Sequence, residues 1–249
     1  MNNSASDRVQ YQQVVSRFTI AGSVMHMNLN PDFTGFLIPD TMKGLLMIMF
    51  CIAAFCSDGQ EATTRSDESG WESPYSLPTP EGWTTEQFPI PIGFAPQINY
   101  NGVEDIRFSP GWGNAASEEY WTYAFLWYLD GSPETDAEII AGNLKAYYTG
   151  LIQVNTDSTK ISTRIFQPVT TSFTKIPTDN NDSETFTGTI GMVDYMQHRP
   201  ITLNCRVHLK YLPEAGKTII FYEISPQLFT HKNWQMLNQL WTDFRFNRN

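Results

Sequence analysis

The sequence predicts an α+β fold, a layered sandwich with a mainly antiparallel sheet and two main helices. Two observations carry this prediction. Several short segments rich in aromatic and β-branched residues are separated by turn residues, as in antiparallel strands. Two other segments, one in the middle of the chain and one at its end, carry apolar residues at helical spacing. Hairpin-connected strands crossed by two helices form a layered sandwich.

The first part of the domain is predicted to be extended and then to form two strands. Prolines recur between residues 71 and 96, so this segment is expected to wrap over the domain or to lie at a sheet edge. Residues 103–110 form a short strand that ends at the turn 111–114. Residues 120–129, YWTYAFLWYL, are apolar on both alternating faces, which is typical of a central strand covered on both sides.

The two helices are predicted from their start signals and their apolar spacing. The first begins at Ser132, because a capping serine precedes a proline and an acid, and it ends near Gly150. Its apolar residues recur at spacings of four, three and four, at Ile140, Leu144, Tyr147 and Leu151. The second begins near Lys232 and carries an aromatic stripe that is expected to dock onto the sheet.

Four strands are predicted between the helices, over 161–176, 186–196, 201–212 and 217–225, with a bend or break at Pro168 in the first. Residues 201–212 alternate without error, so Cys205 is expected to face the core. The connection PEAG at 213–216 closes a hairpin. Counting outward from it places Arg206 directly opposite Glu223.

The amino-terminal part is interpreted as containing a signal for export. Residues 42–56, MKGLLMIMFCIAAFC, have the methionine, lysine and short apolar run of a signal peptide; a buried core helix is the alternative. Cleavage is expected before Ser57, or Cys56 is lipidated. Residues 1–41 are interpreted as an unstructured upstream over-extension, 57–70 as a flexible tether and 71–249 as a single globular domain. The expected location is extracytoplasmic: periplasmic, in the cell envelope or secreted.

Charge and motifs restrict the classes of function. The net charge of −10 and the pI of about 4.8 repel phosphate backbones, so no nucleic-acid partner is expected. Membrane contact is expected only through the signal or a lipid anchor. The nucleophile-elbow, zincin, P-loop and dinucleotide motifs are absent from the sequence. The histidines do not have metal-site spacing, and neither a metal nor a cofactor is expected.

Glu104 is the catalytic candidate. On the 103–110 strand it shares a face with Ile106 and Phe108, the apolar side. A carboxylate there is either paired or has a raised pKa. We interpret it as an ion pair with Arg206 or Arg164, and keep a functional carboxylate in a cleft as the alternative.

The candidate ligand-binding residues are Arg206, His208 and Lys210, which follow Asn204 on one face of the 201–212 strand. They form a cationic stripe in an otherwise acidic chain. Such donors could contact a ligand that bears a carboxylate or a sulfate. The alternative is a solvated sheet face with cross-strand partners such as Glu223.

Two resemblances accompany these patterns. The signal, the segments FPIPIGFAP, GVEDIRFSPGW and YWTYAFLWYLDG, and the terminal helix are similar to uncharacterised secreted proteins of environmental bacteria over residues 83–246. The order of elements resembles the PsbP/Mog1-like sandwich. This second resemblance implies a fold without a function, and neither one transfers a site residue.

Three functional hypotheses follow. The first is an exported non-enzymatic binding or accessory domain whose partner is an unknown protein or small-molecule ligand. The second is a secreted hydrolase that uses Glu104, and the third a structural envelope component. A pocket around Glu104 with a raised carboxyl pKa would favour the enzyme. A solid aromatic core with an open polar sheet face would favour binding.

Overall fold

The computed structural model describes residues 73–156, 168–178 and 182–247. The signal-type segment 42–56, the tether 57–70, residues 1–41, Cys56 and Arg164 lie outside the described residues, and so does the first part of the predicted strand 161–176. The expectations for these parts of the chain therefore stay predictions.

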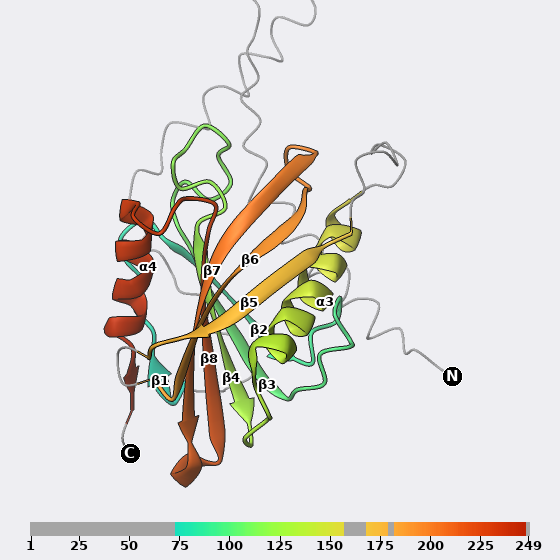
Figure 1. The fold of residues 1–249 in the computed structure, drawn as a ribbon. Coiled ribbons are helices and arrows are strands. Elements are labelled where there is room, and N and C mark those ends of the chain that lie inside the picture. The colour runs from blue at the N-terminus through green and yellow to red at the C-terminus, as the bar shows by residue number, and fades with distance from the viewer. Residues whose placement is uncertain (1–72, 157–167, 179–181, 248–249) are drawn as a thin grey trace, which may run out of the picture. The chain divides into compact units, whose positions relative to one another are not determined.

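The fold is α+β, as predicted: a seven-stranded antiparallel sheet with a helix packed on each face (Figure 1). The strands lie in the order β2-β3-β4-β8-β7-β6-β5. Their bounds are β2 Thr84–Ile90, β3 Gly102–Phe108, β4 Tyr123–Asp130, β5 Thr170–Ile176, β6 Glu184–Asp194, β7 Arg199–Leu212 and β8 Lys217–Ser225. The helices are α3 Ala137–Asn155 and α4 Lys232–Thr242, and the short helix η2 Pro213–Ala215 joins β7 to β8.

Two hydrophobic clusters lie on opposite faces of the sheet because successive strand residues point to opposite sides. On the α3 side, Phe125 stacks on Tyr147 of α3 and on Tyr222 of β8, with ring centroids 5.4 and 4.4 Å apart. On the α4 side, Leu126 and Phe221 pack against a cluster that includes Trp241 of α4. The central strand β4 is therefore covered on both sides, as its apolar pattern predicts.

The proline-rich segment both wraps the domain and supplies an edge strand, as expected. Strand β2 lies at one edge of the sheet and contains Pro89. Before it, β1 Tyr75–Ser76 pairs with β9 Arg245–Phe246 near the end of the chain. The buried Arg107 donates hydrogen bonds to the carbonyls of Leu77 and Pro78, which holds this segment against the α4 side.

Both predicted ends of the first helix are wrong. It begins after Asp136, whose carboxylate accepts a hydrogen bond from Ile139 N at 2.8 Å, and not at Ser132. It also continues past Gly150 to Asn155. Gly150 does not terminate the helix but permits close packing, because a Cβ there would lie 1.9 Å from the carbonyl oxygen of Phe94.

Candidate functional site

Strand β7 carries the cationic stripe on the α4 side, with the predicted register. Arg206 lies opposite Glu223, and on the other face Val207 lies opposite Tyr222 and Leu209 opposite Ile220. The four-residue connection Pro213–Gly216 fixes this count, since Gly216 adopts the left-handed conformation, with φ 59°, that closes it. Cys205 faces the α3 side and is buried, which confirms its predicted orientation.

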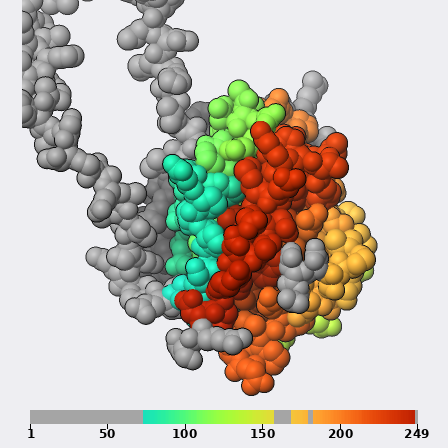
Figure 2. Space-filling model, turned by 90° about the vertical axis from the view of Figure 1, so that its left-hand side faces the viewer, coloured from blue at the N-terminus to red at the C-terminus, as the bar shows by residue number. Residues whose placement is uncertain are grey.

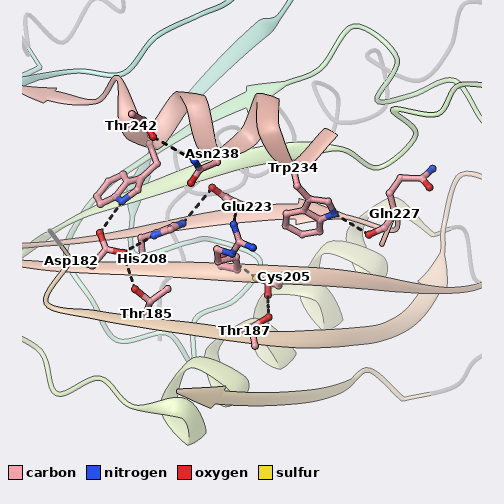
Figure 3. Close-up of polar contacts among 12 residues, drawn as sticks. Asp182, Thr185, Thr187, Cys205, His208, Glu223, Gln227, Trp234, Asn238 and Thr242 are labelled. Carbon is pink, nitrogen blue, oxygen red and sulfur yellow. Dashed lines mark hydrogen bonds and ion pairs between the residues drawn. The ribbon is translucent and has the colours of Figure 1, made fainter. Parts of the chain in front are cut away.

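His208 lies at the centre of the stripe and is only 1% exposed (Figure 3). Its Nδ1 is 2.7 Å from Asp182 Oδ2, and its Nε2 is 3.3 Å from Glu223 Oε1. An ionised carboxylate only accepts hydrogen bonds, so two ionised partners favour the imidazolium, in which both ring nitrogens donate. Burial by itself would lower the pKa of His208, but the hydrogen bonds and charges of Asp182 and Glu223 outweigh it and raise that pKa.

The expectation of a solvated sheet face is wrong at His208. Trp241 of α4 stacks on the imidazole with ring centroids 5.4 Å apart. The Trp241 indole donates to Asp182 Oδ1 at 2.8 Å, while Thr185 donates to Asp182 Oδ2 at 2.8 Å. Asp182 therefore connects the loop before β6, the stripe and α4.

Asp182 was not predicted as a site residue, because it lies in the polar stretch TDNNDSE, which has the composition of an ordinary loop. No local pattern in the sequence distinguishes Asp182 from its neighbours. Its partners His208 and Trp241 are distant in sequence and come together only in the folded chain.

The other two residues of the stripe lie at the margins of α4. The Arg206 guanidinium is 3.6 Å from Glu223 Oε2, and it lies over the rings of Phe229 and Trp234 at 5.4 and 5.9 Å. The Lys210 ammonium lies over Trp241 at 5.2 Å. The structure thus keeps the three residues on one face but places them in different surroundings.

Glu104 lies on the opposite face of the sheet from the stripe, on the apolar side as predicted, and is 1% exposed. Its Oε1 accepts a hydrogen bond from Trp127 Nε1 at 3.0 Å. Burial raises the pKa of Glu104 to about 7, although hydrogen bonds from Trp127 and Tyr147 act in the opposite direction. The interpretation that Arg206 pairs with Glu104 is wrong, because the sheet separates them and Arg206 is opposite Glu223.

Beside α4, the sheet carries polar side chains that face the solvent. The register aligns them in rows across three strands: Ser172, Thr189 and Asn204 in one row, and Thr174, Thr187 and Arg206 in the next. A third row runs from Thr170 through Gly191 to Thr202. We call this surface the open face. Its exposed members are Thr170, Ser172, Thr174, Thr189 and Thr202, while Thr187, Asn204 and Arg206 are half-buried. In Figure 2 the gold surface of β5 lies beside the red helix α4.

The loop between β8 and α4 borders the open face and presents two adjacent apolar side chains. Leu228 is 75% and Phe229 39% exposed. The backbone around them is fixed, since Asn204 Nδ2 donates to Gln227 O at 3.0 Å and Trp234 Nε1 donates to the same oxygen at 3.0 Å. The adjacent Leu-Phe pair in this turn is a sequence signal for the feature, although these residues were not among the predicted site residues.

Other chemistry is limited in the described part of the chain. Burial raises the pKa of the Cys205 thiol well above its ordinary value, so the reactive thiolate is disfavoured. Within residues 73–156, 168–178 and 182–247, no three histidine, cysteine, aspartate or glutamate side chains group to hold a metal ion. Nor is any helix in these ranges long and apolar enough to cross a membrane.

No family model matches this chain, and comparison with curated proteins and with solved structures gives no match either.

Proposed function

We propose that the chain is an exported, non-enzymatic binding domain, and that its binding surface is the open face with Leu228 and Phe229 at the border. The observation that carries the proposal is the uncovered, hydroxyl-lined part of the sheet next to a filled aromatic core. Contiguous exposed apolar side chains, unlike isolated ones, commonly mark a place where another molecule docks, and Leu228 and Phe229 are adjacent.

The burial of the reactive side chains supports a binding role over a catalytic one. A general acid, a general base or a nucleophile must reach the substrate that it attacks or protonates. Glu104, Cys205 and His208 are all enclosed by their neighbours. The open face instead presents hydroxyl, amide and guanidinium groups, which suit hydrogen bonding better than chemical conversion.

The surface is continuous and already ordered. Asn204 belongs to the open face and also holds the backbone of the bordering loop, while Arg206 connects the open face to the ring of Phe229. A ligand would therefore meet side chains whose supporting backbone is fixed in advance. Such preorganisation lowers the entropic cost of binding.

Export is supported by the sequence of residues 42–56 and by the cysteine content. If the signal is removed before Ser57, Cys205 is the single cysteine that remains. A buried free thiol is compatible with an oxidising or a reducing compartment. The proposed location is the periplasm, the envelope or the medium.

A secreted hydrolase that uses Glu104 is the second candidate, and the pKa of about 7 favours it. Substrate would need Trp127 and Tyr147 to move away from the carboxyl group. This candidate predicts that the purified chain cleaves members of a panel of nitrophenyl glycosides and esters, and that Glu104→Gln removes the activity. If the chain cleaves none of them, the hydrolase candidate loses its support.

A site-specific photo-crosslink tests the binding surface. The full chain is produced in its source cells with benzoylphenylalanine at Thr189 or at Leu228, and with Glu214 on the exposed hairpin end as the matched control position. We expect a defined adduct from Thr189 and Leu228 and none from Glu214. Equal labelling at Glu214, or no adduct at the two surface positions, contradicts the proposal.

A further inference from the structure

We propose that the occupant of the open face is a neutral polysaccharide, an inference that rests on the proposed binding function. The first support is the chemistry of the side chains. Threonine and serine hydroxyls both donate and accept hydrogen bonds, as sugar hydroxyls do, and the amide of Asn204 also offers both. Among the described residues, the hydroxyls of Thr170, Ser172, Thr174 and Thr189 make no side-chain hydrogen bond that a ligand would need to break.

The geometry suits an extended chain. Residues two apart on one strand lie about 7 Å apart, and neighbouring strands about 5 Å apart. From Thr170 to Thr174 and from β5 to β7, the open face therefore measures about 13 by 10 Å, enough for a few sugar rings. Gly191 places no side chain in the middle of the third row, where a Cβ would lie 2.6 Å from Thr170 Oγ1.

Charge selects a neutral ligand over an acidic one. The rows that form the open face contain no carboxylate, and their single cation, Arg206, is paired with the buried Glu223. The whole chain carries a net charge of −10, which repels a polyanion at a distance. A neutral polyol chain meets neither an uncompensated charge nor this repulsion.

An aromatic ring completes the surface. Phe229 is partly exposed beside Arg206, and its ring also packs against Trp234, with ring centroids 4.3 Å apart. The ring is therefore held in place while part of it still faces solvent. Sugar rings have apolar C–H faces that pack on exposed aromatic rings, while their hydroxyls reach neighbouring polar groups. Ligand sites commonly combine aromatic surface with a few fixed polar groups in this way.

Affinity electrophoresis of the full chain tests the inference. The native gels contain hydroxyethylcellulose, galactomannan or pullulan as neutral probes, and polygalacturonate as the acidic probe. We expect at least one neutral polysaccharide to retard the chain. The double variant Thr174→Ala/Thr189→Ala and the single variant Phe229→Ala should each weaken binding about tenfold.

The matched control is Thr85→Ala/Gln87→Ala, which removes exposed polar groups from the edge strand at the other end of the same sheet. It should bind as the unmodified chain does. Urea unfolding shows whether each variant is folded, and because all these positions are exposed or half-buried, large losses of stability are not expected.

Three results would overturn the inference: no retardation by a neutral polysaccharide, retardation by polygalacturonate alone, or equal binding by the Thr174/Thr189 variant. The proposed binding function is judged separately. If the crosslinker at Thr189 captures a protein while every polysaccharide fails, the binding surface stands and the polysaccharide is wrong. If the crosslinker also fails, both are wrong.

Discussion

Replacing Glu104 by glutamine should make the domain more stable above pH 7 and leave it almost unchanged below pH 5. Burial raises the folded-state pKa of Glu104 from the ordinary 4.5 to about 7. The stability contributed by the protonated carboxyl is therefore complete below pH 4.5 and is lost as the pH rises through about 7. The difference between the two values corresponds to about 3 kcal/mol, at about 1.4 kcal/mol per pKa unit.

Glutamine keeps the acceptor oxygen that Trp127 Nε1 contacts and has no proton to lose. We therefore expect Glu104→Gln to be about 3 kcal/mol more stable than the unmodified chain at pH 8. At pH 4.5 the two should agree within about 1 kcal/mol, the size of one altered hydrogen bond. Urea unfolding followed by tryptophan fluorescence at both pH values measures the difference.

Other titrating groups are present in both proteins, so their contributions cancel in the difference. Glu214→Gln, on the exposed η2 segment, is the matched control for changing a carboxyl group to an amide. An equal stability difference between the Glu104→Gln variant and the unmodified chain at pH 4.5 and pH 8 would contradict this prediction. Glu104 would then ionise in the folded protein as easily as in the unfolded one.

Three further predictions test the packing. His208→Gln should lower the free energy of unfolding by about 3 kcal/mol at pH 6, because two buried carboxylates lose the cation between them. The pKa of His208 is raised above 6.5, so this loss of stability should shrink as the pH rises through that raised value. The same loss at pH 6 and pH 9 in urea unfolding would argue against a charged His208. Gly150→Ala should destabilise the domain by about 1–3 kcal/mol, whereas Gly142→Ala, which has open space on the same helix, should stabilise it by up to about 1 kcal/mol. Equal effects of the two substitutions in thermal melts would contradict close packing at Gly150. Thiol reagents should label Cys205 only after unfolding, and rapid labelling of the native chain would show that it does not face the core.

The sheet was predictable because its signals are local. Side-chain alternation in β7 and the four-residue turn after it determine the pairing of Arg206 with Glu223, and the structure confirms that pairing. The ends of the first helix were not predictable in the same way. The start at Asp136 competes with an equally good signal at Ser132, and Gly150 resembles a helix end although it serves contact with Phe94.

The candidate site was also predictable only in its local features. Alternation placed Arg206, His208 and Lys210 on one face, but it could not show that Trp241 covers His208. Nor could it show that Asp182 completes the buried network, or that Ser172 and Thr189 stay uncovered beside it. The covering of a sheet face depends on where a distant helix docks.

Local sequence patterns were enough to predict the α+β class, the inward face of Cys205 and the register of the last hairpin, since each follows from residues a few positions apart. The surroundings of Glu104 and His208 and the extent of the open face emerge only in the folded chain. These depend on contacts between segments far apart in the chain, such as Asp182 with Trp241, and on the burial that makes a carboxyl group hold its proton near pH 7.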